Sequence, residues 1–180
     1  MRMIQMGTTG LTATAPALGC LPLQRRSTED AVRLIRKAYE GGIRFYDTAN
    51  AYSDSEYKLG IALQGVRENV VIATKSMKTE KAGVLADIKN SLTMLKTDYI
   101  DLFQFHCVKT VPDIHNPDGA FAAALEAKKA GMIRHIGVTA HLIEVAEQCI
   151  ETGWFETLQF PFSYISNERD LDLARKCAEK

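Results

Sequence analysis

Cysteine, long apolar runs and an excess of charge of either sign are all scarce in this 180-residue sequence. The four cysteines lie far apart and have neither the paired spacing of a zinc site nor the density of a disulfide framework. We therefore interpret them as reduced thiols of a cytoplasmic protein. They are Cys20, Cys107, Cys149 and Cys177.

Two further absences limit the partners of the chain. No segment approaches the roughly 18 consecutive apolar residues of a membrane span, and residues 1–10 lack the apolar core of a signal peptide. The 22 basic side chains are matched by 22 acidic ones, whereas a broad nucleic-acid footprint needs a basic excess. We expect neither a membrane nor a nucleic acid as partner.

What the chain does contain is a regular alternation of strand-like and helix-like segments. The pattern repeats about every 30 residues, the length of a βαβ unit, and 46% of the residues are hydrophobic. Helix 28–40 has an N-cap at Ser27 or Thr28 and ends at two glycines. A hairpin is expected at residues 3–6 and from residue 11 onward. The expected strands are 15–20, 43–48, 70–74, 99–106, 133–138 and 158–162, and the expected helices are 28–40, 55–63, 81–95, 119–130, 142–150 and 171–178.

This alternation predicts an α/β fold with a parallel sheet and helical crossovers. The pattern alone allows an open doubly wound sheet or a closed barrel. The turn after Gly19 reads Cys20-Leu21-Pro22-Leu23-Gln24 and lacks the G-x-G-x-x-G of a dinucleotide-binding unit. The polar residues at the strand ends favour the barrel, because functional side chains of βα barrels gather at the C-terminal ends of the strands.

Three consecutive strands of the prediction end in chemically active side chains: Asp47, Lys75 and His106. Tyr52 follows Asp47 by five residues in the same loop. Each residue has a simpler interpretation, as a turn cap, a solvated charge, a satisfied buried histidine or a packed loop aromatic. Their occurrence together at one mouth favours a catalytic set.

Three segments carry a resemblance to a known family. They are Phe45-Tyr46-Asp47-Thr48-Ala49-Asn50-Ala51-Tyr52-Ser53-Asp54-Ser55-Glu56-Tyr57-Lys58-Leu59-Gly60, Val71-Ile72-Ala73-Thr74-Lys75, and residues 92–106. In these segments the chain resembles the aldo-keto reductase superfamily. The resemblance implies a (β/α)8 TIM barrel and reduction of a small-molecule aldehyde or ketone with NADPH, or alternatively NADH. Residues 136–141 are closer to branches of the family with a C-terminal iron–sulfur segment, which is absent from this sequence.

The resemblance assigns a role to each residue of the set. Tyr52 would donate the proton, and the nearby Lys75 ammonium would lower the pKa of this phenol. Asp47 would pair with Lys75. His106 would orient the substrate oxygen or share the proton relay, depending on its protonation.

The expected cofactor contacts are Gly19, Cys20, Asp47, Thr139 and Gln159. Thr139 and Gln159 match family residues that hydrogen-bond the nicotinamide carboxamide, although they could instead cap a turn and pack a strand end. Two positions depart from the family pattern: Ala140 replaces an asparagine, and Ser53 replaces a glycine. No metal site is expected.

A third departure concerns length. The sequence is interpreted as one domain, residues 1–180, a barrel truncated after about six βα units and therefore C-terminally incomplete. Such a piece would leave sheet edges that favour self-association across the open barrel edge, and it could be inactive. Two alternatives remain open, a non-catalytic nucleotide-binding or regulatory subunit on the same fold and an unrelated barrel enzyme for phosphorylated substrates.

Overall fold

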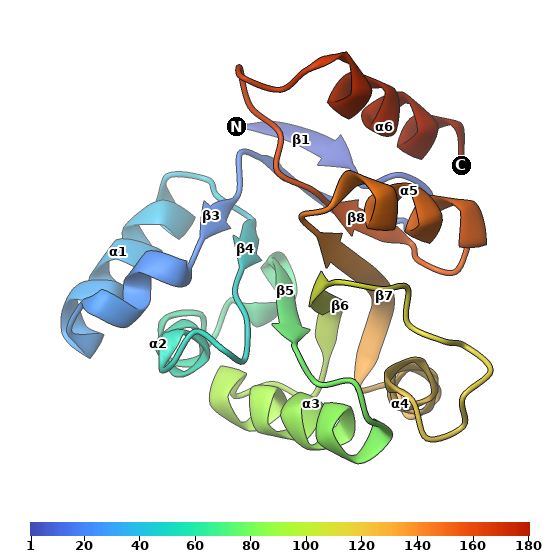
Figure 1. Ribbon diagram of the computed structural model, residues 1–180. Helices are drawn as coiled ribbons and strands as arrows, with labels where there is room; N and C mark the ends of the chain where they lie inside the picture. Colours follow the sequence, from blue (N-terminus) through green and yellow to red (C-terminus); the bar gives the residue numbers. More distant parts are fainter.

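The structure, a computed structural model, describes all residues from 1 to 180. Its centre is a six-stranded parallel sheet in which the strands follow one another in chain order, β3-β4-β5-β6-β7-β8. The sheet curls, and helices surround its outer side (Figure 1). This arrangement confirms the predicted α/β class and the partial barrel.

The elements have the following bounds. An antiparallel hairpin of β1 (Arg2–Gln5) and β2 (Thr12–Ala15) comes first. The strands of the main sheet are β3 (Leu18–Gly19), β4 (Phe45–Asp47), β5 (Val71–Ser76), β6 (Ile100–Val108), β7 (Ile133–Ala140) and β8 (Thr157–Gln159). The helices are α1 (Thr28–Glu40), α2 (Ser55–Ala62), α3 (Lys81–Leu95), α4 (Ala120–Lys129), α5 (Ile143–Thr152) and α6 (Glu168–Glu179), with short 3₁₀ turns η1 (Leu21–Arg25) and η2 (Arg67–Asn69).

The predicted start and end of α1 are confirmed by its caps. The Ser27 hydroxyl accepts a hydrogen bond from the backbone N–H of Asp30 at 3.1 Å. After the helix, Gly42 adopts a φ of +96°, a conformation that residues with a side chain rarely reach. The two glycines therefore end α1 and return the chain to β4.

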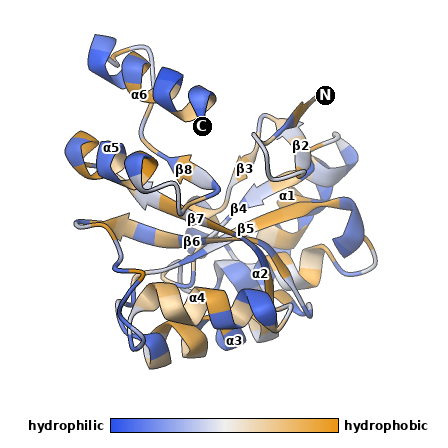
Figure 2. Ribbon diagram, turned by 90° about the vertical axis from the view of Figure 1, so that its right-hand side faces the viewer, coloured by the Kyte–Doolittle hydropathy of each residue, from blue (hydrophilic) through white to orange (hydrophobic).

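The two faces of the sheet have different roles. Side chains such as Ile72, Phe103 and Ile136 point toward the helices and belong to a core of 30 buried hydrophobic residues. Because side chains alternate along a strand, Lys75 and Gln104, which are paired in register, lie on the opposite, inner face. In Figure 2 the central strands are largely orange, the colour of hydrophobic residues, while the helices also contain blue, hydrophilic residues. The helix-facing core thus supports an inner face that is free to carry polar groups.

Most strand bounds differ from the prediction by one or more residues, and three of the differences have a clear cause or consequence. The segment 15–20 forms only the two-residue β3, because Ala15 pairs with Arg2 in the hairpin and Pro16 has no N–H to donate. Strand β8 ends at Gln159, two residues before Pro161, for the same reason. Strand β6 continues past His106 to Val108, through a register irregularity between Phe105 and Val108.

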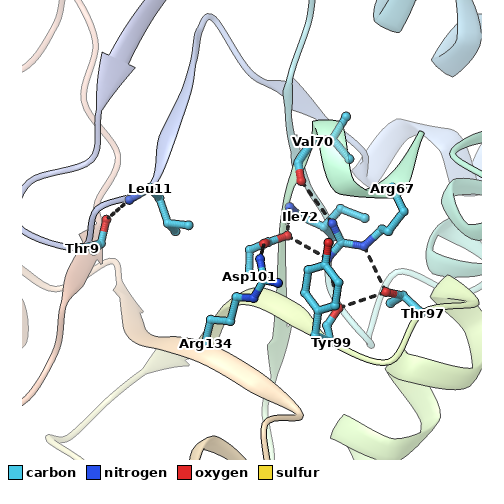
Figure 3. A network of polar contacts seen from close by, with 9 residues as sticks. All are labelled: Thr9, Leu11, Arg67, Val70, Ile72, Thr97, Tyr99, Asp101 and Arg134. Atoms are coloured by element: carbon cyan, nitrogen blue, oxygen red, sulfur yellow. Dashed lines mark hydrogen bonds and ion pairs between the residues drawn. The ribbon is translucent and has the colours of Figure 1, made fainter. Parts of the chain in front are cut away.

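A polar network ties three strands together at their N-terminal ends (Figure 3). The Asp101 carboxylate accepts from Arg67 Nη2 at 2.7 Å, from Arg134 Nη1 at 3.0 Å and from the Ile72 backbone N–H at 3.0 Å. The guanidinium groups of Arg67 and Arg134 lie over the Tyr99 ring, 4.1 and 3.6 Å from its centroid. Residues at the N-terminal ends of the strands of a βα barrel contribute to stability, whereas catalytic residues lie at the C-terminal ends. We therefore interpret this network as structural.

None of the helices combines the length and the apolar composition that a membrane-spanning helix needs.

Candidate active site

Asp47 and Lys75 form an ion pair at the C-terminal ends of the neighbouring strands β4 and β5. The Lys75 Nζ lies 2.7 Å from Asp47 Oδ1 and donates to the Thr48 carbonyl oxygen, also at 2.7 Å. Only 2% of the Lys75 side chain is exposed, compared with 19% for Asp47. The simpler interpretation of Lys75 as a solvated charge is therefore wrong, and the expected pairing with Asp47 is confirmed.

Tyr52 is held over this pair by the loop that follows β4. The backbone N–H of Asn50 donates to the Lys75 carbonyl at 3.0 Å, and that of Tyr52 donates to the Ala49 carbonyl at 3.0 Å. The Tyr52 ring centroid lies 5.5 Å from Lys75 Nζ and 5.7 Å from the His106 ring centroid, which it meets edge to face. The structure thus brings all four predicted residues together.

The charge environment of Tyr52 differs from the expectation. Burial raises the pKa of the phenol above its ordinary value of 10, and the negative charge of Asp47 raises it further. The predicted lowering by Lys75 is not found, because the Asp47 carboxylate balances the ammonium at contact distance. A raised pKa keeps the phenol protonated at neutral pH.

His106 is neutral at physiological pH. Burial lowers the pKa of the imidazole to about 4, and the charges of Lys75 and His141 act in the same direction. Its Nδ1 is buried and has no hydrogen-bond partner. A neutral imidazole has one N–H donor and one free acceptor nitrogen, so His106 can hydrogen-bond a substrate oxygen without adding charge.

A cavity of about 170 Å³ opens beside these residues. It includes Tyr52, Lys75 and His106, while Gly19, Cys20 and Asp47 are not part of its wall. The lining residues are Tyr52, Lys75, His106, Cys107, Thr139, His141, Gln159, Phe160 and Pro161.

Thr139 and Gln159 sit side by side in this wall, because β7 and β8 pair them in register. The Thr139 hydroxyl oxygen accepts the backbone N–H of Cys107 at 2.7 Å, which leaves its own O–H free to donate. Gln159 is exposed to the cavity side. Both carboxamide contacts expected from the sequence are therefore available in the same cavity.

Gly19 and Cys20, at the end of β3, contact the backbone of Asp47 and not the cavity. Gly19 pairs in register with Asp47, and the Cys20 N–H donates to the Asp47 carbonyl at 2.8 Å. The Cys20 thiol is fully buried and directed at the Leu18 carbonyl, 3.4 Å away. Gly19 and Cys20 thus fix the backbone of Asp47, and the Cys20 side chain takes no part in the cavity wall.

Sequence reasoning overlooked His141, which enters the cavity wall directly after β7. Its position one residue beyond a strand end was the available signal. The side chain of Cys107, at the end of β6, also lines the cavity and lies 3.7 Å from His141 Nε2.

The profile of the aldo/keto reductase family matches residues 3–180, almost the entire chain. The chain belongs to the aldo/keto reductase family. The family resemblance inferred from residues 45–60 is thereby confirmed.

Relatives within the aldo/keto reductase family are similar over most of this chain. YqkF of Bacillus subtilis (strain 168), described as an uncharacterized oxidoreductase, is 32% identical over 177 residues, which cover 91% of this chain and 56% of YqkF. The methylglyoxal reductase DkgA of Escherichia coli (strain K12) is 36% identical over 142 residues, which cover 77% of this chain and 50% of DkgA. The chain therefore spans about half the length of these relatives.

A solved structure shares the fold. The holo form of the aldo-keto reductase AKR11C1 from Bacillus halodurans superposes with a TM-score of 0.86 at 28% identity. The match covers 99% of this chain and 64% of AKR11C1.

Proposed function

We propose that this protein reduces an aldehyde or ketone to an alcohol with NADPH, and that Tyr52 donates the proton. The observation that carries the proposal is the convergence at one cavity of Tyr52, a neutral His106 and the buried Lys75 ammonium, which is paired with Asp47. Membership in the aldo/keto reductase family and the oxidoreductase relatives support the same chemistry.

Each residue has a distinct task in this proposal. The Tyr52 phenol, kept protonated by its raised pKa, donates a proton to the carbonyl oxygen of the substrate. The neutral His106 orients that oxygen by a hydrogen bond. The Lys75 ammonium lies 5.5 Å from the Tyr52 ring centroid. Asp47 keeps Lys75 in position by the 2.7 Å ion pair.

The cavity also suits the carboxamide of a nicotinamide. Thr139 retains a free O–H donor, and the amide of Gln159 offers both a donor and an acceptor beside it. These two residues would hold the carboxamide and fix the face of the ring. NADPH, when bound, supplies a hydride for the carbonyl carbon. NADH is the alternative cofactor.

A second cavity next to His106 offers space for the substrate. A larger cavity of about 430 Å³ shares His106 and Cys107 with the first one and extends to the segment between β6 and α4. Met77, Val111 and Pro112 give it apolar walls. We propose that the reactive carbonyl lies at His106 and that an apolar substituent occupies this second space.

Turnover of 4-nitrobenzaldehyde, followed by the loss of NADPH absorbance, tests the function. We expect Tyr52→Phe to lower kcat by roughly 10²- to 10⁴-fold, because the ring is retained and only the donated proton is lost. Tyr57→Phe, at an exposed tyrosine on α2, serves as the matched control and keeps wild-type activity.

The assay separates the proposal from its alternative. Binding of NADPH, measured by its fluorescence, without turnover of any aldehyde would contradict a reductase and support a nucleotide-binding subunit. Equal turnover by Tyr52→Phe and the wild type would contradict the assignment of Tyr52 as the proton donor.

A further inference from the structure

A thiol and an imidazole form a pair in the wall of the catalytic cavity. Cys107 Sγ lies 3.7 Å from His141 Nε2, although 34 residues separate them in the chain. Cys107 lies near the end of β6 and His141 directly after β7, so the two neighbouring strands hold the pair together. Neither side chain has a task in the proposed carbonyl reduction.

The backbone fixes Cys107 in this position. Its φ of +53° is in the left-handed region, where a residue with a side chain is uncommon, and its N–H donates to Thr139 Oγ1 at 2.7 Å. The register irregularity of β6 falls at the same point. The thiol consequently faces the cavity that also contains Tyr52 and His106.

The other three thiols have different surroundings. Cys20 and Cys149 are buried, and burial raises the pKa of these thiols to about 12 and about 11. Cys177, on α6, does not line the cavity, and partial burial of its thiol also raises its pKa. Apolar burial keeps a thiol protonated, whereas an imidazole beside a thiol can take its proton. Cys107 is thus the cysteine whose surroundings favour reaction with a small electrophile.

We propose that Cys107 is a site of reversible thiolation by low-molecular-weight disulfides and that the adduct closes the catalytic cavity. The effect on catalysis rests on the proposed function, whereas the modification itself does not. The Cys107 thiolate attacks one sulfur of the disulfide, the S–S bond of the reagent breaks, and a mixed disulfide forms. The reagent's second sulfur leaves as a thiolate, and His141 takes the proton from Cys107 and returns it to that thiolate.

The size of the cavity explains the expected inhibition. The space beside Tyr52 and His106 is about 170 Å³, and Cys107 also lines the larger space proposed for the substrate. Even a group as small as cysteamine on Cys107 would project into the volume that a carbonyl must enter. The protein would then respond to the thiol–disulfide balance of its surroundings.

Treatment with cystamine tests the proposal. We expect intact-mass analysis to show one rapidly added cysteamine, peptide mapping to place it on Cys107, and aldehyde reduction to fall in parallel. Dithiothreitol should remove the adduct and restore activity. Cys107→Ser should lose both the rapid adduct and the inhibition, each relative to its own untreated sample.

Two further variants sharpen the test. Cys177→Ser is the matched control and should be modified at Cys107 as fast as the wild type. His141→Gln should slow modification of Cys107 by about threefold to tenfold, because it removes the base that takes the Cys107 proton. Modification of Cys177 as fast as Cys107, or an unchanged rate in His141→Gln, would overturn the proposal.

The failure of the proposed function would be recognised separately. If Cys107 is modified but the untreated protein reduces no aldehyde, the reductase assignment fails while the thiolation site stands. In that case closure of the cavity is measured by NADPH fluorescence, and binding that is unchanged by the adduct would contradict it.

Discussion

Lys75 illustrates how a single residue depends on its partner. Its ammonium is almost fully buried, which would be costly without compensation, and Asp47 together with the Thr48 carbonyl provides that compensation. The same pairing weakens the effect of Lys75 on Tyr52. The convergence of the four predicted residues could be inferred from sequence, because Asp47, Lys75 and His106 lie near the C-terminal ends of three neighbouring strands. The direction of the Tyr52 pKa was not, because it depends on burial and on distances between residues that are far apart in the chain.

The lowered pKa of His106 predicts a pH-dependent contribution to stability. The imidazole takes up a proton near pH 6.5 in the unfolded chain and near pH 4 in the folded one. Between these values the unfolded state binds more protons, so this contribution is fully present above pH 6.5 and is lost as the pH falls toward 4. We expect the thermal midpoint of the wild type to fall more steeply over this interval than that of His106→Gln. If the thermal midpoints of the wild type and of His106→Gln fall by the same amount as the pH is lowered, His106 is not held neutral by the fold.

At the scale of elements, helices were predicted more accurately than strands. The bounds of α1 and α3 agree with the prediction, because apolar periodicity and caps are local signals in the sequence. Strand ends depend on pairing with a neighbour. Strand β6 therefore extends to Val108, and the left-handed backbone of Cys107 has no local signal such as glycine. The contact between Cys107 and His141, which are 34 residues apart in the chain, was accessible only from the structure.

Contact between α2 and α3 requires a glycine. A Cβ placed on Gly60 would lie 2.2 Å from the Met94 carbonyl oxygen and 2.8 Å from the Leu95 carbonyl carbon, and both are backbone atoms that cannot rotate away. We expect Gly60→Ala to lower the free energy of unfolding by about 3 kcal/mol, despite the better helix propensity of alanine. Urea denaturation measures this change.

Gly83→Ala, within α3, is the matched control for Gly60→Ala. Its Cβ would meet only the flexible Lys78 side chain, at 3.2 Å or more. We therefore expect a change within about 1 kcal/mol and in the stabilising direction. A loss as large as that of Gly60→Ala would show that the close approach of the two helices is not the cause.

At the scale of the whole molecule, the network around Asp101 holds β5, β6 and β7 together at their N-terminal ends. Asp101 is 2% exposed and accepts hydrogen bonds from Arg67, Arg134 and the backbone of Ile72. We expect Asp101→Asn to cost about 3 kcal/mol, because two guanidinium groups lose their countercharge. Asp98→Asn, at an exposed carboxylate nearby in the chain, should change stability by less than about 0.5 kcal/mol. Equal unfolding midpoints in urea for the two variants would contradict a structural role of the network.

The ends of the sheet lead to a prediction about association. In the order β3-β4-β5-β6-β7-β8, strands β3 and β8 each have one unpaired edge. Large apolar side chains follow β8 in the exposed segment 160–166. They include Phe162, Tyr164 and Ile165, which are 56%, 99% and 78% exposed. An unpaired edge beside exposed apolar side chains is a template for contact with a second chain.

We propose that this 180-residue chain self-associates through the β8 edge and the segment 160–166. Sedimentation velocity over a range of concentrations should show a mass that rises from the 20.0 kDa of one chain toward that of two. The double variant Phe162→Ser, Ile165→Ser should shift this rise to higher concentration, because it removes apolar area at the contact. Leu125→Ser, at a leucine of α4 that is 49% exposed, controls for the loss of surface hydrophobicity elsewhere and should associate like the wild type. A single 20.0 kDa species at every concentration would contradict association, and equal effects of both variants would place it at another surface.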